Sequence, residues 1–258
     1  MRTELSERWV RGWIGDLAVV DARGALLFWE DDFPVPNYAF EPADVRTDLL
    51  QQRSGPPTGI PWFFGPHGPV SVWYDLVLAD RRIPGVAWER DDPAVAGRII
   101  VCWAPGLLDR WTEEDEQVAG HPRDPHHRVD ALHSSRHVVV SLDGRLLGET
   151  RDPVLLFETN VPTRYYLPEA DLVAEALEPS RARSQCPYKG TADRYWSIRG
   201  VPDASDVAWS YSDPFPAVGA IAGRVAFYNE LVDFTVDGVD LPRAVSVFSR
   251  REHRPAAG

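Results

Sequence analysis

The sequence predicts a mainly β protein made of antiparallel strands with at most short helices, and three observations carry this prediction. The 23 prolines among 258 residues argue against long helices. The ten tryptophans favour strands and supply bulk for a core. Short apolar runs such as 138–142 and 154–157 are bounded by turn residues, including the Asp143–Gly144 pair that is typical of two-residue hairpins.

The chain also matches itself in three places. The matching pairs are "NYAFEPADV" at 37–45 with "RYYLPEADL" at 164–172, "AWERDDP" at 87–93 with "AWSYSDP" at 208–214, and "VAGRIIV" at 95–101 with "IAGRVAF" at 221–227. The pairs occur in the same order and lie roughly 125 residues apart. We therefore expect two tandem copies of one domain, each of a size that can fold alone.

Composition gives the expected boundaries of these copies. Residues 1–112 form a degenerate N-terminal copy, and residues 127–245 form the C-terminal copy. Residues 113–126 are polar and acidic, then rich in His and Pro, which indicates a linker. Residues 246–258 are expected to be a tail. The segment 171–179 fits a short helix or a strand, because periodicity does not distinguish the two in a run this short.

Charge and hydropathy limit the classes of partner. A formal net charge of −12 disfavours binding to nucleic acid or to an anionic membrane. The chain has no run of 18 apolar residues and no apolar run typical of a signal peptide, so we expect a cytoplasmic protein. Cys102 and Cys186 are then expected to be free thiols.

The C-terminal half contains several ordered segments that resemble one family. The segments are "HPRDPHHRVDAL", "SSRHVVVSLDG", "PVLLFET", "RYYLP", "CPYKGTA", "YWS", "AWSY" and "IAGRVAFYNE". Together they resemble the family catalogued as domain of unknown function 427, and the first half resembles it only through the matches given above. The resemblance implies a β-tent-like fold in each copy, in which two antiparallel sheets meet at an angle. It implies no established activity.

The residues do not support two kinds of metal chemistry linked to this resemblance. The family is catalogued in places under a nucleotidyltransferase label, but the chain lacks the Gly-Ser turn and the Asp-x-Asp pair that are common in that class. It has no Cys-x-x-Cys for the zinc knuckles of β-tent relatives. Adjacent His126 and His127 cannot easily turn to one ion. We expect no metal and no cofactor.

The segment "CPYKG" at 186–190 holds the strongest candidates for a site. It aligns with "PWFFG" at 61–65, so that Gly190 matches Gly65. A shared glycine indicates a turn that both copies need, with positive φ. The polar residues that occur in the second copy alone are Cys186, Tyr188 and Lys189. They indicate a site that the first copy has lost.

Three residues are candidate catalytic groups: Lys189, Cys186 and Glu158. Lys189 is either an oriented ammonium or a solvated surface charge. Cys186 is a thiolate if Lys189 lowers its pKa, and otherwise a small buried hydrophobe. Glu158 follows an apolar strand and aligns with Asp31, so a structural acid explains it as well as catalysis does.

Six further residues are candidate ligand contacts: Arg136, His137, Arg164, Tyr166, Tyr188 and Trp196. Arg136 and His137 open a predicted strand and have no counterpart at Asp16 and Leu17. The aromatic candidates suit a pocket wall or plain core packing.

Two classes of function remain open from these residues. The first class is a pocket protein. Acidic, basic and cationic side chains that meet in one pocket predict that the C-terminal copy binds a small anionic molecule, with or without catalysis. The alternative is a non-enzymatic interaction or scaffold module that presents an aromatic-rich β face to a protein. Convergence of the candidate residues in one cleft would favour the first class.

Overall fold

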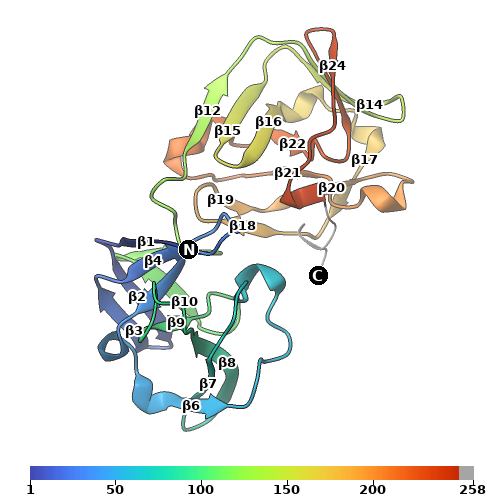
Figure 1. Cartoon of the computed structure of the whole chain (residues 1–258). Helices are drawn as coiled ribbons and strands as arrows, with labels where there is room; N and C mark the ends of the chain where they lie inside the picture. The colour runs from blue at the N-terminus through green and yellow to red at the C-terminus, as the bar shows by residue number, and fades with distance from the viewer. Residues whose placement is uncertain (250–258) are drawn as a thin grey trace. The chain divides into compact units, whose positions relative to one another are not determined.

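The computed structural model describes residues 1–249 and confirms the predicted fold class. The chain divides into two compact units, Met1–Pro125 and the part that begins at His126. Every paired strand within the named sheets is antiparallel, and the helical segments described are 3-10 turns of three to six residues. Figure 1 colours the chain from blue at the N-terminus to red at the C-terminus and labels strands of both units.

The N-terminal unit contains a seven-stranded and a four-stranded sheet. The larger sheet has the order β1 (Arg2–Leu5), β4 (Leu26–Trp29), β5 (Asn37–Phe40), β9 (Ile99–Val101), β8 (Arg82–Glu89), β7 (Val72–Val77) and β6 (Leu50–Arg53). The smaller has the order β11 (Glu116–Val118), β10 (Arg110–Glu113), β2 (Trp9–Ile14) and β3 (Leu17–Arg23).

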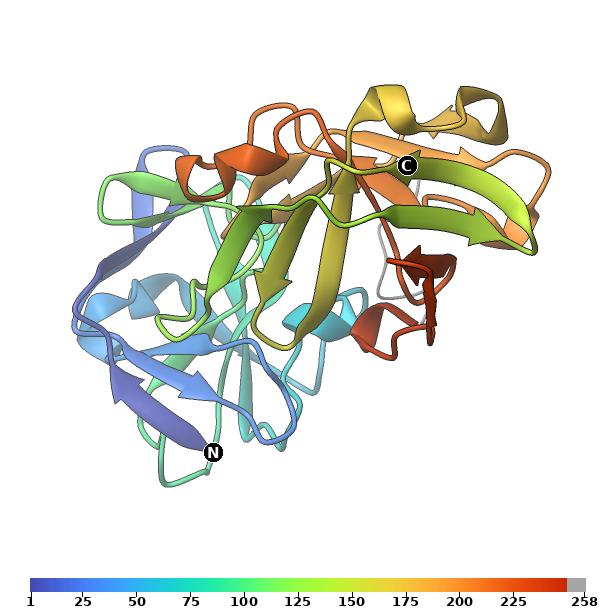
Figure 2. The same cartoon turned by 90° about the horizontal axis from the view of Figure 1, so that it is seen from above.

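The C-terminal unit again contains a seven-stranded and a four-stranded sheet. The larger has the order β12 (Val129–His133), β15 (Val154–Glu158), β16 (Val161–Leu167), β22 (Val225–Phe227), β21 (Ala208–Ser210), β20 (Arg194–Ile198) and β17 (Leu177–Ser180). The smaller has the order β14 (Arg145–Thr150), β13 (Val138–Leu142), β23 (Asp233–Val236) and β24 (Val239–Leu241). A separate hairpin joins β18 (Ser184–Cys186) to β19 (Gly190–Ala192). Figure 2 shows the β13–β14 hairpin in light green.

Short 3-10 turns connect the strands. They are η1 (Pro42–Asp44), η2 (Thr47–Leu49), η3 (Trp62–Phe64), η4 (Glu169–Asp171), η5 (Ala174–Ala176), η6 (Pro202–Ala204), η7 (Pro216–Ile221) and η8 (Val247–Ser249). The ambiguous segment 171–179 is therefore part 3-10 turn and part strand, with η5 followed by β17. Within residues 1–249, no helix has the length and apolar character needed to cross a bilayer.

The strand order is the same in both units when β1 to β11 are matched, in sequence, to β12 to β17 and β20 to β24. The register extends the match to single residues. Tyr38 lies opposite Leu27 as Tyr165 lies opposite Leu155. Trp88 of β8 lies opposite Trp73 of β7, and Trp209 of β21 lies opposite Tyr195 of β20.

Alternate residues of the larger C-terminal sheet face two different cores. Tyr165 belongs to the core that contains Val140 and Phe234 of the four-stranded sheet. Tyr166, the next residue, belongs to the core that contains Ala192 and the turn η7. Successive side chains of a strand point to opposite faces, so one face of the sheet meets its smaller partner and the other carries the β18–β19 hairpin.

The expected linker is partly wrong. The hairpin of β10 and β11 continues the N-terminal unit to Val118, inside the segment 113–126. Its outward residues are acidic, which produced the linker-like composition, whereas Trp111 and Val118 are buried in the core of the unit. In the expected tail, 246–258, Phe248 packs against a core of the C-terminal unit. Residues 250–258 lie outside the described part of the chain.

Candidate functional site

A buried ion pair joins Glu158, the last residue of β15, to Lys189 in the turn between β18 and β19. The ammonium of Lys189 donates a hydrogen bond to Oε2 of Glu158. Lys189 is 8% exposed, so the reading of a solvated surface charge is wrong. Burial alone would raise the pKa of Glu158, but the charge of Lys189 and the hydrogen bonds to the carboxylate outweigh burial and lower the pKa to about 2.

The ion pair also keeps Lys189 protonated. Burial disfavours its ammonium, yet the negative charges that Cys186 and Glu158 can carry outweigh burial, and the pKa of Lys189 is raised. An amine that holds its proton this firmly is neither a nucleophile nor a base at neutral pH. Lys189 therefore presents a fixed positive charge with hydrogen-bond donors.

The turn that carries Lys189 depends on Gly190. Its φ is +98°, a conformation that residues with a side chain rarely adopt. The carbonyl of Lys189 accepts a hydrogen bond from the backbone N–H of Phe215, 3.0 Å away, which fixes the turn against the segment before η7. Gly65 does not share this conformation, because its φ of −79° is extended. The expectation that both glycines serve one kind of turn is wrong.

His127 holds the other oxygen of Glu158. Its Nε2 lies 3.1 Å from Oε1 of the carboxylate. The imidazole stacks on the ring of Tyr188, with centroids 3.9 Å apart and planes inclined by 10°. Sequence reasoning considered this histidine only as a metal ligand. Among the described residues, no group of three or more His, Cys, Asp or Glu side chains is arranged to hold a metal ion.

Neutral groups with exchangeable protons surround the ion pair. Tyr166 is fully buried, its hydroxyl oxygen accepts a hydrogen bond from Trp209 Nε1 at 3.2 Å, and burial raises its pKa. Burial also raises the pKa of Cys186, with a smaller opposing effect from Lys189. Tyr211, which sequence reasoning missed although it ends the quoted segment "AWSY", has its pKa raised by burial and by Cys186. These groups remain protonated at neutral pH.

Arg164 is close to this cluster but fully engaged. Its two terminal nitrogens bind both oxygens of Glu230 at 2.6 and 2.8 Å, and one of them also donates to Asn229 at 3.0 Å. The guanidinium also lies over the rings of Trp209 and Tyr228. A buried, bidentate arginine of this kind organises the fold and has little capacity left for a ligand.

Three candidates lie away from Lys189. Arg136 pairs with Asp237 at 2.7 Å and His137 with Glu149 at 2.7 Å, both beside the four-stranded sheet. Trp196 packs against the core between the two sheets, whereas its neighbour Tyr195 belongs to the core on the Lys189 face. The structure therefore does not bring these three to the cluster.

The sequence alignment also matched Arg136 and His137 to the wrong residues of the N-terminal unit. The strand begins at Val138, so Arg136 and His137 precede it and do not open it. Val138 pairs with Val236 as Val10 pairs with Glu113, so His137 corresponds to Trp9. The alignment with Asp16 and Leu17 was therefore wrong by eight residues.

Residues 130–238 match a family model described as a domain of unknown function (DUF427). The DUF427 segment contains Glu158, Tyr166, Cys186 and Lys189, and it begins just after His127. Comparison with curated proteins gives no match.

Outside the DUF427 segment, the N-terminal unit contains a second buried carboxylate at the matching place. The register of β4 aligns Glu30 with Glu158, not Asp31 as expected, since Leu27 corresponds to Leu155. Glu30 pairs with Arg90 at 2.5 Å and accepts hydrogen bonds from the backbone N–H of His67. Asp31 is exposed and binds the terminal amine at Met1.

Proposed function

We propose that the C-terminal unit binds a small anionic molecule at a cluster defined by His127, Glu158, Tyr166, Cys186 and Lys189, here called the lysine cluster. The observation that carries this proposal is the buried ammonium of Lys189. An ammonium has three donors, and within residues 1–249 Glu158 is the one acceptor described for it. Two N–H groups are available to a ligand.

The neighbours of Lys189 supply further donors. The hydroxyl of Tyr166 accepts from Trp209, and its own proton is available for a hydrogen bond. Hydrogen bonds from an ammonium to a carboxylate or phosphoryl oxygen are roughly twice as strong as those between neutral groups. A ligand with such an oxygen matches the lysine cluster better than an apolar or a cationic ligand does.

Glu158 acts in this proposal as a positioning residue. It holds Lys189 in place and keeps it charged, and it is itself held by His127.

Catalysis by Cys186 or Lys189 as nucleophile is less well supported than binding. Both groups carry their protons at neutral pH. The carboxylate of Glu158, which accepts from Lys189, has too low a pKa to remove a proton from it. The chemistry that suits the cluster is donation of hydrogen bonds, or of a proton, to a bound oxygen.

We also propose that the two units are copies of one domain, of which the N-terminal one has lost the lysine cluster and kept its carboxylate. The common strand order and the matched positions of Tyr38 with Tyr165 and Trp88 with Trp209 support this. An experimental structure in which these pairs occupied different strands would contradict it.

Calorimetric titration of the full chain tests the binding proposal, with inorganic phosphate and acetate as probes and glycerol as a neutral comparison. The test variant is the double substitution Lys189→Met/Glu158→Gln, which removes both charges together. Arg136→Met is the matched control, because it removes a cation of the same unit that lies away from the cluster. We expect binding of the anions by the wild type and the control, and at least tenfold weaker binding by the double variant.

Two results would overturn the proposal. One is equal affinity of the wild type and the double variant for phosphate and acetate. The other is the absence of heat with either anion at millimolar concentration. Both would favour the interaction module in place of a binding site.

A further inference from the structure

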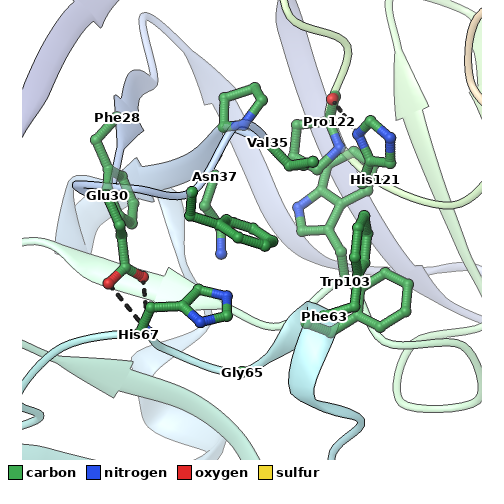
Figure 3. A pocket seen from close by; sticks show the side chains of 13 residues that line it. Phe28, Glu30, Val35, Asn37, Phe63, Gly65, His67, Trp103, His121 and Pro122 are labelled. Atoms are coloured by element: carbon green, nitrogen blue, oxygen red, sulfur yellow. Dashed lines mark hydrogen bonds between the residues drawn. The ribbon is translucent and has the colours of Figure 1, made fainter. Parts of the chain in front are cut away.

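Two cavities of the N-terminal unit differ in what they can hold. The space beside Glu30, which Figure 3 shows between aromatic side chains, has a volume of about 20 Å³ and fits about one water molecule. A second, more open cavity has a volume of about 380 Å³, within the range of sites for small molecules. We call it the acidic cavity, and its lining consists of Arg8, Glu113, Glu114, Asp115, Glu116 and Arg123.

The C-terminal unit shows that the fold does not require acids at this place. Glu113 and Glu116 lie directly opposite one another in the hairpin of β10 and β11. The matching pair in the hairpin of β23 and β24 is Val236 and Val239. Like charges at directly opposite positions of two strands destabilise a sheet. The N-terminal unit therefore carries a pair of acids that costs it stability, where its counterpart carries an apolar pair.

Glu113 is the buried member of the lining, with a side chain that is 3% exposed. Its Oε1 accepts hydrogen bonds from the hydroxyl of Tyr38 at 3.1 Å and from the backbone N–H of Arg123 at 3.2 Å. Its Oε2 is buried and makes no hydrogen bond within the described residues, although Arg8 Nη1 lies 3.2 Å away. A buried oxygen without a hydrogen bond destabilises the folded chain, and a donor on a ligand would satisfy it.

Two exposed carboxylates of the lining are accessible to a ligand. Glu114 pairs with no cation within the described residues. Glu116 is 79% exposed, and the distance of 3.8 Å from Arg123 Nη1 to its Oε2 is too long for a hydrogen bond. Asp115 is paired with Arg11 at 2.8 Å. The four carboxylates of the lining outnumber its guanidinium groups even when Arg11 is included, so the cavity attracts a cation.

The arrangement of the acids favours an organic cation over a metal ion. No three His, Cys, Asp or Glu side chains of residues 1–249 are placed to hold a metal. The acids are instead spread along a hairpin and its turn, around a cavity much larger than an ion. A ligand that matches them has positive charges that are separated from one another.

We propose that the acidic cavity binds a linear diamine. One ammonium lies between the opposed carboxylates of Glu113 and Glu116, where it reduces their repulsion and donates to Oε2 of Glu113. The other ammonium pairs with Glu114. The site lies in the N-terminal unit and does not depend on the lysine cluster.

The test is an NMR titration of the full chain with 1,4-diaminobutane at low salt, since salt screens exposed charges. We expect saturable shifts of the backbone amide signals of residues 113–116, and at least fivefold weaker binding by Glu114→Gln/Glu116→Gln. The matched control is Asp80→Asn/Asp91→Asn, which removes two exposed carboxylates of the same unit that do not line the cavity. It changes the net charge equally, and its affinity should stay within twofold of the wild type.

Four outcomes would overturn the inference. Equal weakening in the control would show a general attraction to a chain of net charge −12. Butylamine binding as tightly as 1,4-diaminobutane would show that the second ammonium makes no contact. Displacement of the diamine by an equal concentration of Ca²⁺ would show a metal site. The absence of saturable shifts would show that the cavity holds solvent. Lys189→Met/Glu158→Gln should bind the diamine normally, so failure here is distinguishable from failure of the proposed anion site.

Discussion

Glu30 and Glu158 occupy the same position in two units with the same strand order, yet each is neutralised by a cation from a different element. Arg90 follows β8 directly, whereas Lys189 comes from the β18–β19 hairpin. A buried carboxylate must be paired with a cation or become protonated, but several positions can supply the cation. The comparison teaches that both units keep a buried carboxylate at this position of the fold. The cation that pairs with it, and the side chains around it, differ between the units.

The choice of cation changes what else the site can do. A guanidinium presents its donors in a rigid fork, whereas an ammonium is a compact charge with three donors. Each acid also has a histidine near it that contacts an aromatic ring, His67 with Phe33 and His127 with Tyr188. In the N-terminal unit the neutralised carboxylate of Glu30 therefore lies beside aromatic side chains. In the C-terminal unit the neutralised carboxylate of Glu158 lies among hydrogen-bond donors.

The largest expected effect comes from removal of either cation alone. Lys189→Met and Arg90→Met each leave a buried carboxylate unpaired, which should destabilise the altered unit by about 3–5 kcal/mol. Urea unfolding, with hydrogen exchange to report on each unit, measures this. The double variants Lys189→Met/Glu158→Gln and Arg90→Met/Glu30→Gln should recover most of the loss. Single variants within about 0.5 kcal/mol of wild type would show that the pairs are exposed in solution.

The loss of stability at acid pH should reveal the contribution of the Glu158–Lys189 ion pair. The pKa of Glu158 is lowered from 4.5 to about 2 by folding, so its contribution is complete above the unfolded value and is lost as the pH falls from about 5 to 2. The loss is about 3 kcal/mol at 1.36 kcal/mol per pKa unit. Unfolding measured between pH 7 and 2 tests this, and Lys189→Met/Glu158→Gln should show a flatter limb. An equally steep limb in that variant would assign the acid sensitivity to other carboxylates.

The two glycines of the aligned segments should respond differently to alanine. Gly190→Ala forces a side chain into a positive-φ turn and should cost about 1–3 kcal/mol. Gly65→Ala places a Cβ at ordinary contact distance in extended backbone and should change stability by less than about 0.5 kcal/mol. Thermal unfolding of the two variants measures these two stability changes. Equal costs would mean that the turns are alike after all.

The smallest effect concerns the two thiols. Burial raises the pKa of Cys102 to about 11 and also raises that of Cys186, so both should be poor nucleophiles in the folded protein. We expect iodoacetamide at pH 7.5 to alkylate both at least tenfold more slowly in the native chain than in urea, as mass spectrometry of the peptides would show. Fast native alkylation of Cys186 alone would identify it as an activated thiolate and would bring the C-terminal unit closer to an enzyme.

The fold class could be predicted because its signals are local. Proline content, tryptophans and the Asp143–Gly144 turn indicate short antiparallel strands without reference to distant residues. The internal matches gave the pairs Tyr38 with Tyr165 and Trp88 with Trp209, which the register places at equivalent positions. The hairpin of β10 and β11 was missed because its exposed face has the composition of a linker.

The site was predictable only where chain neighbours are also neighbours in space. Cys186, Tyr188 and Lys189 come from one turn, so a single segment revealed them. Arg136 failed because the sheet that a strand joins depends on long-range pairing, which periodicity does not report. Glu158 was matched to Asp31 and not Glu30, an error of one residue that moves a side chain to the other face of a strand.

The small sheet of each unit brings together strands from opposite ends of that unit. The N–H of Trp9 at the start of β2 bonds to Glu114, 105 residues later, and that of His137 bonds to Asp237, 100 residues later. Pairing over such separations folds slowly, because loop-closure entropy is lost before the contacts form. During synthesis the N-terminal unit is therefore expected to stay open at this sheet until β10 has left the ribosome, and then to close while the other unit is still being made.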